Sequence, residues 1–181
     1  MVTRRISSGV EVTLIEKLLS REGNPLSFLF ESTETSKVVD EFGEPLTVYH
    51  GTNAEFDEFT IAGTKTDDGM YGHGYYFTDE YSSGKYGKYK ISANLVIDNP
   101  LILNDSAQSW MREINGIPEA KDLEDLREIE KLPNYKKHYS AKEITREIIN
   151  QGYDGVIVYP SNHAETEYVV FDNKQIKIID K

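Results

Sequence analysis

The chain has 181 residues, a length that suits one domain with a substantial core. It contains no cysteine, which excludes disulfides, thiolate nucleophiles and cysteine-ligated metal sites. Its 31 acidic residues outnumber 20 basic ones, and the net charge of −11 opposes non-specific binding to a phosphate backbone. No apolar run approaches the roughly 20 residues of a membrane span, and the N-terminal segment lacks a signal-peptide core. We therefore expect a cytoplasmic protein with no membrane partner.

The first half of the chain predicts a helix, a strand and a long loop. Residues 10–22 carry apolar side chains at helical spacing, and the Gly-Asn-Pro sequence that follows ends this predicted helix. Residues 46–50 predict a strand on which His50 shares a face with Leu46 and Val48. Residues 53–71 have the composition of a loop.

The second half alternates predicted strands and helices. Short strands are expected at 75–78, within 91–103, at 153–159 and within 167–179. Residues 140–152 predict a helix, since Ser140 and Glu143 form a capping box. The whole chain, 1–181, is predicted to be one α+β domain. Residues 1–35 would form an N-terminal helical extension, and about 105–135 a helical insertion or lid outside the main sheet.

Three distant segments carry groups that cleavage of NAD at its nicotinamide bond requires. Nicotinamide leaves as a neutral molecule, and positive charge develops on the ribose as it departs. A fixed carboxylate near that sugar stabilises the charge as it forms, and Glu167, before an apolar run, suits this role. Tyr76 and Tyr86 can grip the flat nicotinamide ring, and His50 can bond ribose hydroxyls.

Glycines beside these groups would let the backbone approach a ligand closely. Gly51 follows His50, and Gly74 precedes the tyrosine pair. A lysine–tyrosine stretch, GKYGKYK at 84–90, could contact cofactor phosphates or an acceptor. An exposed polar face is the alternative for this stretch.

At these residues the chain resembles a family. HGT at 50–52, GYYFTDEYSSGKY at 74–86 and EYVVFD at 167–172 are similar to the His–Tyr–Glu class of ADP-ribosyltransferases. That class includes the diphtheria toxin catalytic domain and the poly(ADP-ribose) polymerases. SKVVDEFGEPLTVYHGT at 36–52 is most similar to ADP-ribosyltransferase-like domains of phage and prophage polyvalent proteins. The resemblance covers about 36–98 and 140–180, and it implies two packed, mostly antiparallel sheets around a central NAD cleft with flanking helices.

The resemblance also assigns roles to single residues. It implies that His50 holds the adenosine ribose, that Gly51 grips the nicotinamide amide, and that Tyr76 stacks on nicotinamide. Ser83 and Tyr86 match a serine-x-x-tyrosine pair that supplies an amide contact and a second stacking ring, with Ser82 as a competitor for the serine. Glu167 matches the catalytic glutamate. The cofactor site expected from the match comprises His50, Gly51, Thr52, Gly74, Tyr75, Tyr76, Ser83 and Tyr86.

Several other polar residues have two interpretations. Glu165 and Glu167 form the E-x-E pattern that arginine-modifying transferases use to orient an acceptor, although Glu165 could equally belong to the acidic surface. No three of the histidines have metal-binding spacing, so no metal is expected. His73 could reach the site, whereas His138 and His163 are expected at the surface. Asp172 and Gln175 are expected to be structural turn residues.

The expected function is mono-ADP-ribosyl transfer from NAD to a macromolecular acceptor, with release of nicotinamide. A protein acceptor is favoured over nucleic acid because of the charge of −11. Two alternatives stay open: an NAD glycohydrolase, and a catalytically silent module that binds NAD or a partner. By analogy with phage-associated domains, a toxin or effector that acts on a host is the expected setting.

Overall fold

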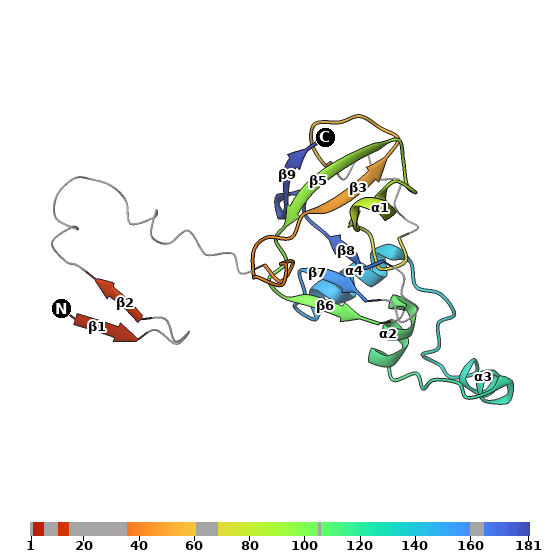
Figure 1. Ribbon diagram of the computed structural model, residues 1–181. Helices are drawn as coiled ribbons and strands as arrows, with labels where there is room; N and C mark the ends of the chain where they lie inside the picture. Colours follow the sequence, from red (N-terminus) through yellow and green to blue (C-terminus); the bar gives the residue numbers. More distant parts are fainter. Residues whose placement is uncertain (1, 6–10, 15–35, 61–68, 105, 160–164) are drawn as a thin grey trace. The chain divides into compact units, whose positions relative to one another are not determined.

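The computed structural model describes residues 2–5, 11–14, 36–60, 69–104, 106–159 and 165–181 (Figure 1). The contacts between Cα atoms divide the chain into two units, Met1–Thr33 and Glu34–Lys181. Each unit has its own strands, and each is described here by itself.

The first unit contains a pair of short strands. β1, Val2–Arg5, pairs antiparallel with β2, Glu11–Leu14, so that Val2 lies opposite Leu14. The helix predicted over 10–22 is therefore wrong at 11–14, and its remaining residues lie outside the described part. Val12 and Thr13 are β-branched and favour an extended chain once a partner strand is available.

The second unit contains two sheets. The three-stranded sheet has the order β3-β5-β9, formed by Val48–Thr52, Tyr89–Leu95 and Ile176–Asp180, and both of its pairings are antiparallel. The four-stranded sheet has the order β4-β8-β7-β6. Its strands are Tyr75–Phe77, Glu167–Val170, Gly155–Val158 and Pro100–Leu103. Only the β7–β6 pairing in this sheet is parallel. The α+β class and the mostly antiparallel sheets are confirmed.

Among the described residues of the second unit there are also four α-helices and one 3₁₀ turn. The helices are α1, Glu80–Ser83; α2, Ala107–Ile114; α3, Leu123–Ile129; and α4, Ala141–Asn150. The 3₁₀ turn spans Asn173–Gln175. At α4 the predicted capping box is confirmed, because the Ser140 hydroxyl accepts from the Glu143 N–H while the Glu143 carboxylate accepts from the Ser140 N–H.

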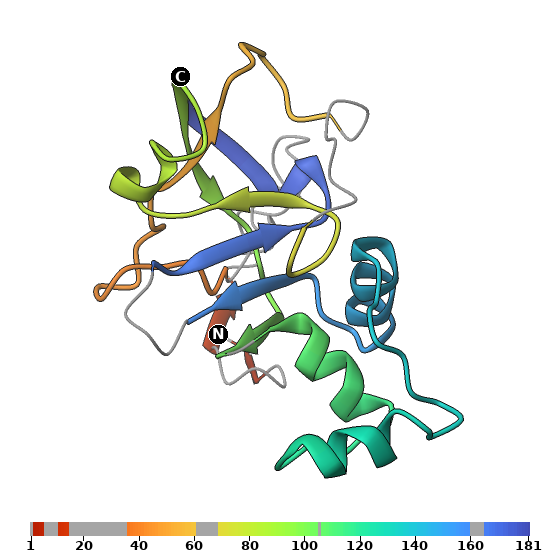
Figure 2. The same cartoon turned by 90° about the vertical axis from the view of Figure 1, so that its right-hand side faces the viewer.

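Two apolar clusters divide the second unit into three layers. The first cluster lies between the sheets and joins Val48 and Ile91 to Phe77, Ile157 and Val170. The second cluster lies on the other face of the four-stranded sheet, where α2 and α4 pack (Figure 2). All four residues of β7 are buried because this strand has covered faces on both sides.

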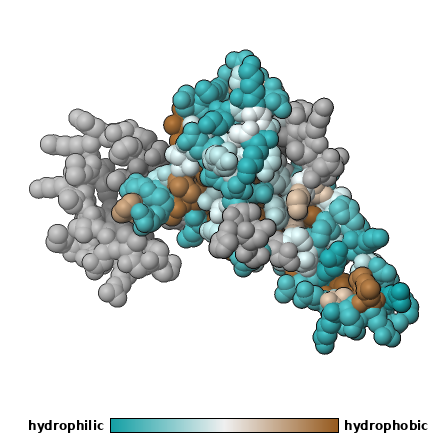
Figure 3. Space-filling model, turned by 45° about the vertical axis from the view of Figure 1, so that its right-hand side comes forward, coloured by the Kyte–Doolittle hydropathy of each residue, from teal (hydrophilic) through white to brown (hydrophobic). Residues whose placement is uncertain are grey.

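Helix α2 belongs to this core. Ala107 and Met111 are buried in one cluster with Ile144 and Ile148 of α4, so α2 contributes to the core that covers the four-stranded sheet. Helix α3 has one buried residue, Ile129. On the face of the second unit that Figure 3 shows, the described surface is mostly hydrophilic, and hydrophobic side chains gather at the α3 end.

The turn before β9 confirms the structural role expected for Asp172 and Gln175. The Gln175 side chain accepts from the Phe171 and Asp172 N–H groups and donates to the carbonyls of Val96 and Asp154. One amide thereby ties β9 to the ends of two other strands. Within the described part of the chain, no helix is long and apolar enough to cross a membrane.

Candidate functional site

His50 lies at the centre of β3, and its imidazole is largely enclosed. Its Nδ1 atom lies 2.8 Å from the carbonyl oxygen of Tyr76. Because a carbonyl oxygen can only accept, Nδ1 carries the proton, and Nε2 of the neutral ring is an acceptor. The ring centroid lies 5.1 Å from that of Phe59 and 5.6 Å from that of Phe77. Burial lowers the pKa of His50, and the bond to Tyr76 opposes this shift.

A backbone bridge joins the two sheets beside His50. The N–H of Tyr49 donates to the carbonyl of Thr78 over 2.8 Å, and the N–H of Thr78 donates back over 2.9 Å. The end of β4 therefore lies against β3. This bridge brings the predicted histidine and tyrosine strands together.

Gly51 lies where no side chain would fit. A Cβ atom there would meet the carbonyl oxygen of Ser83 at 1.9 Å and the Cβ of Tyr86 at 3.0 Å. Ser83 is fully buried, and its hydroxyl donates to the Glu80 carbonyl over 2.8 Å. The missing side chain thus lets α1 and the following residues pack directly on β3.

The Tyr76 side chain points to the helix-covered face of the four-stranded sheet. Its hydroxyl donates to the Gly72 carbonyl over 2.5 Å and accepts from the Tyr71 N–H over 3.1 Å. The ring packs at the edge of the second apolar cluster. Burial raises the pKa of Tyr76, and the charge of Glu167 adds to this rise.

Glu167 opens β8 and faces the same side as Tyr76. Tyr76 lies opposite Val169, and Glu167 precedes Val169 by two residues, so both side chains point to one face of the sheet. Glu167 is half-buried. This burial raises the pKa of Glu167, and the neighbouring Glu165 raises it further. Partial desolvation of the Tyr86 phenol raises its pKa, and the charge of Glu167 adds to this rise.

Tyr75 and Gly74 lie in less accessible positions. Tyr75 is 3% exposed, belongs to the cluster between the sheets, and lies edge-on to Phe59. The Tyr75 side chain is thus part of the packing between the two sheets. A Cβ at Gly74 would meet the Val170 carbonyl oxygen at 2.5 Å, so this glycine serves strand packing.

Two residues of the expected cofactor site, Tyr86 and Thr52, lie at the ends of secondary-structure elements. Tyr86 follows α1, and its side chain is 61% exposed. Thr52 ends β3, and its hydroxyl accepts from the Ala54 N–H over 3.1 Å. Ser82, the competitor for the serine position, is buried like Ser83.

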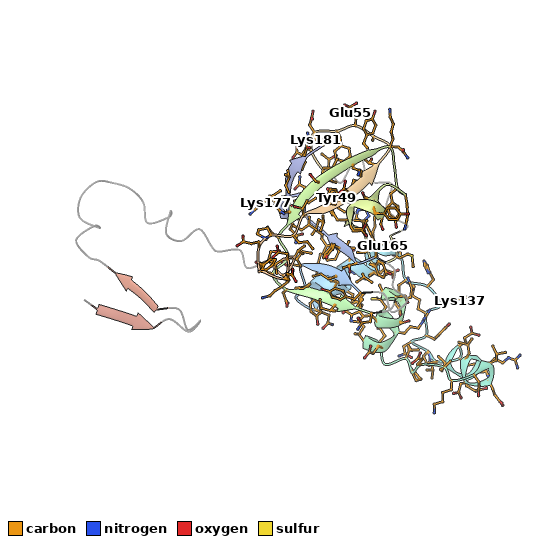
Figure 4. The ribbon with its side chains drawn as sticks, viewed as in Figure 1. Tyr49, Glu55, Lys137, Glu165, Lys177 and Lys181 are labelled. Atoms are coloured by element: carbon orange, nitrogen blue, oxygen red, sulfur yellow. The ribbon has the colours of Figure 1, made fainter. Side chains whose placement is uncertain are left out.

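Lys85 forms an ion pair with Glu165 that the sequence analysis did not predict. Its Nζ lies 2.6 Å from Oε1 of Glu165, on the side of the sheets where α1 lies (Figure 4). This ion pair lowers the pKa of Glu165 to about 2. Phe56 and Phe59, which enclose His50, were also missed. Their spacing in the sequence Phe-Asp-Glu-Phe after β3 was the available signal.

Contacts and strand register link the three segments. His50 bonds the backbone of Tyr76, the Gly51 backbone lies against Ser83 and Tyr86, and Glu167 shares a sheet face with Tyr76. We define the site cluster as His50, Gly51, Tyr76, Tyr86 and Glu167.

Two cavities lie away from the site cluster. One of about 300 Å³ is lined by His73, Thr145 and Arg146 among others, so His73 faces α4. The other, of about 1120 Å³, lies between α2, α3 and the end of β6. His138 is exposed, as expected, and His163 lies outside the described residues. Among the described residues, no group of three His, Asp or Glu side chains could hold a metal ion.

The comparisons with known proteins identify a family for most of the chain. Residues 40–181 match the model of a family described as ADP-Ribosyltransferase in polyvalent proteins. The match includes 105–135, which the sequence resemblance had left out. No curated protein matches the chain.

Among solved structures, the crystal structure of an anti-CRISPR protein matches 74% of this chain and 95% of its own. The two sequences are 17% identical, and the TM-score is 0.36. A likeness at this level says nothing about the function of the chain.

Proposed function

The chain belongs to the family of ADP-ribosyltransferases in polyvalent proteins, and from this premise we propose a specific reaction. We propose that it transfers a single ADP-ribose from NAD to a protein acceptor and releases nicotinamide, in the manner of the His–Tyr–Glu class. One observation carries the proposal. The His50 imidazole lies 2.8 Å from the Tyr76 carbonyl oxygen, and the Tyr76 and Glu167 side chains share one face of the four-stranded sheet.

The proposed chemistry breaks one bond and forms another at the same carbon. The bond between the nicotinamide nitrogen and C1′ of the ribose breaks, and its electron pair leaves with nicotinamide. The ribose then carries an oxocarbenium charge, which the carboxylate of Glu167 stabilises. A nucleophilic atom of the acceptor attacks C1′ and releases its proton to solvent. Since the leaving group is neutral, no general acid is required.

The other residues of the site cluster would bind and orient NAD. Nε2 of His50 is an acceptor in the neutral tautomer, so it would accept a hydrogen bond from a ribose hydroxyl. The ring of Tyr86 is exposed and free to stack on nicotinamide. Tyr76, whose hydroxyl is held by the 71–72 backbone, would form a rigid wall of the same site.

Ser83 has a more limited role in this proposal. Its hydroxyl proton is donated to Glu80, so its oxygen could only accept a hydrogen bond from the nicotinamide amide. It is also fully buried in the ligand-free chain. A contact with NAD would therefore require α1 to shift.

A protein acceptor suits the charge of the chain better than nucleic acid does. The net charge of −11 repels a phosphate backbone. In the lysine–tyrosine stretch two of the three lysines are paired, Lys85 with Glu165 and Lys90 with Glu80. These pairs leave little uncompensated positive charge for a polyanion.

The test is incubation with NAD labelled in its adenine moiety and a bacterial lysate, followed by mass spectrometry. We expect a protein adduct of one ADP-ribose together with free nicotinamide. The control is Glu167→Gln, which keeps the size of the side chain and removes its charge. It should bind NAD within about threefold of the parent and release nicotinamide at least about a hundredfold more slowly.

Two other outcomes would replace the proposal. Free ADP-ribose without any adduct would show that the chain is an NAD glycohydrolase. NAD binding by calorimetry without nicotinamide release over hours would show a silent binding module. Equal rates for the parent and Glu167→Gln would refute the assignment of Glu167.

A further inference from the structure

An ion pair lies immediately beside Glu167. Lys85 comes from the segment after α1, and Glu165 lies two residues before the start of β8. Their charged atoms lie 2.6 Å apart, and the two side chains are 53% and 36% exposed. The pair therefore connects two distant segments at the open edge of the site cluster.

Glu165 lies two residues before Glu167, the first residue of β8, and its charge contributes to the raised pKa of Glu167. The residue between them is held in place, because the Thr78 hydroxyl donates to the Thr166 carbonyl over 3.1 Å. Two like charges so arranged repel, and each disfavours ionisation of the other.

Three titratable groups lie around Glu167. Its charge contributes to the raised pKa of Tyr76, on β4, and to that of Tyr86, after α1. Glu165, before β8, contributes to the raised pKa of Glu167. The pKa of each tyrosine is raised, mainly by burial, so both phenols are neutral at pH 7. Glu165 is thus the charged neighbour of Glu167, and Lys85 is the cation that offsets it.

The other lysines of the stretch have different neighbours. Lys90 pairs with Glu80 over 3.0 Å, and Lys88 lies over the Tyr89 ring at 4.9 Å from its centroid. Neither contacts Glu165 in the interactions that the structure describes. Lys88 therefore offers a matched control for a charge removed from the same segment.

We propose that Lys85 is a positioning residue for the transfer reaction: by pairing with Glu165 it cancels the charge beside Glu167 and keeps the Glu167 carboxylate ionised at neutral pH. This inference rests on the proposed function, since an ionised Glu167 is what the oxocarbenium charge requires. Lys85 acts here through Glu165 and does not itself touch NAD.

The test is a direct titration of the Glu167 carboxyl carbon by NMR in the ligand-free protein. Lys85→Met should raise the pKa of Glu167 by about half a pH unit, as expected for one unscreened charge at the surface. Glu165→Gln should lower it by a similar amount. The double variant should titrate close to the parent, because the two opposite charges that offset each other beside Glu167 are removed together.

Three controls separate this role from a structural one. Lys88→Met should leave the Glu167 titration unchanged, and Lys85→Arg should restore the parent value. The shift caused by Lys85→Met should shrink in about 1 M salt, since exposed charges are screened there. The acid limb of the pH profile for nicotinamide release should move upward in Lys85→Met by the same amount as the titration.

An unchanged Glu167 titration in Lys85→Met would overturn the inference, as would an equal shift in Lys88→Met. The proposed function fails separately. If the parent never releases nicotinamide while the titrations shift as stated, the transferase assignment is refuted and the electrostatic link between Lys85, Glu165 and Glu167 is supported.

Discussion

The Nδ1 atom of His50 donates to the carbonyl oxygen of Tyr76 across 2.8 Å, and this contact joins the two sheets through a side chain. It fixes the imidazole in one tautomer and leaves Nε2 as the acceptor. The same histidine is therefore both a structural link and a candidate ligand contact. The two roles use different nitrogen atoms, so they can be separated by substitution.

Two substitutions of equal size separate these roles. His50→Asn keeps a donor near the position of Nδ1, whereas His50→Leu keeps none, and both remove Nε2. We expect both to weaken NAD binding about fivefold to tenfold, the effect of one neutral hydrogen bond. Only His50→Leu should lose a further ~1–3 kcal/mol of unfolding free energy, because the Tyr76 carbonyl loses its donor. Calorimetry and urea unfolding measure the two effects. Equal stability of the two variants would contradict the structural link.

The stability of the chain should depend on pH through His50. Burial lowers its pKa, so the unfolded chain binds the proton more tightly than the folded one. The contribution of neutral His50 to the unfolding free energy is therefore fully present above pH 6.5, the pKa in the unfolded chain. It is lost as the pH falls from 6.5 through the lowered pKa of the folded state. Between pH 7.5 and 5.5 the parent should lose more unfolding free energy than His50→Asn, by at most about 1.4 kcal/mol per pH unit.

Other titrating groups do not obscure this comparison. The pKa values of Glu143 and Glu165 are lowered to about 2, so their contributions are lost only below pH 4.5. Glu167, with a raised pKa, acts in the opposite sense, but both chains retain it. Parallel stability curves for the parent and His50→Asn would mean that the imidazole is not enclosed as described.

Gly51→Ala should destabilise the fold by about 1–3 kcal/mol, the usual cost of overpacking. The added methyl group would lie 1.9 Å from the Ser83 carbonyl oxygen, so β3 and α1 would have to separate. Gly84→Ala is the control: its Cβ would come no closer than 3.4 Å to a neighbour, and its φ of −63° suits alanine. We expect its stability within about 0.5 kcal/mol of the parent in urea unfolding. A similar loss in both variants would argue against the close contact.

Gln175→Ala should cost about 2–3 kcal/mol of unfolding free energy. The amide makes four hydrogen bonds, two of them to the Val96 and Asp154 carbonyls at 3.0 and 2.8 Å. Gln175→Glu should be as costly, since it places a carboxylate against those carbonyl oxygens. The adjacent exposed residue provides the control, Lys174→Ala, which should change stability by less than about 0.5 kcal/mol. A tolerated Gln175→Glu would disprove the donor role of the amide.

The elements that were predicted well carry their signals within a few residues. Ser140 and Glu143 cap α4 as expected, and the alternation of Ile91, Ala93 and Leu95 matches β5. The helix expected at 11–14 was wrong because β2 depends on pairing with β1, whose residues lie earlier in the chain. A short window shows the preferences of its own residues but not those of a partner strand.

The candidate site also contains adjacent residues whose different positions depend on distant partners. Tyr75 and Tyr76 are chemically identical neighbours, and both were expected in the cofactor site. The pairing of β4 with β8 turns Tyr75 into the core between the sheets and Tyr76 toward the face that carries Glu167. The sequence predicts that Tyr75 and Tyr76 point to opposite faces of a strand. Which of the two faces is buried depends on the elements that pack against it.

The linear sequence alone shows the order of the motifs and the chemistry of their side chains, because motif spacing and helix caps are local properties. These features point to an ADP-ribosyltransferase. The contact of His50 with Tyr76, the close approach of Gly51 to Ser83, and the pairing of Lys85 with Glu165 emerge only in three dimensions. Each of these contacts joins residues that are 26 to 80 positions apart in the sequence. Such pairings arise when the whole unit folds, and no local pattern encodes them.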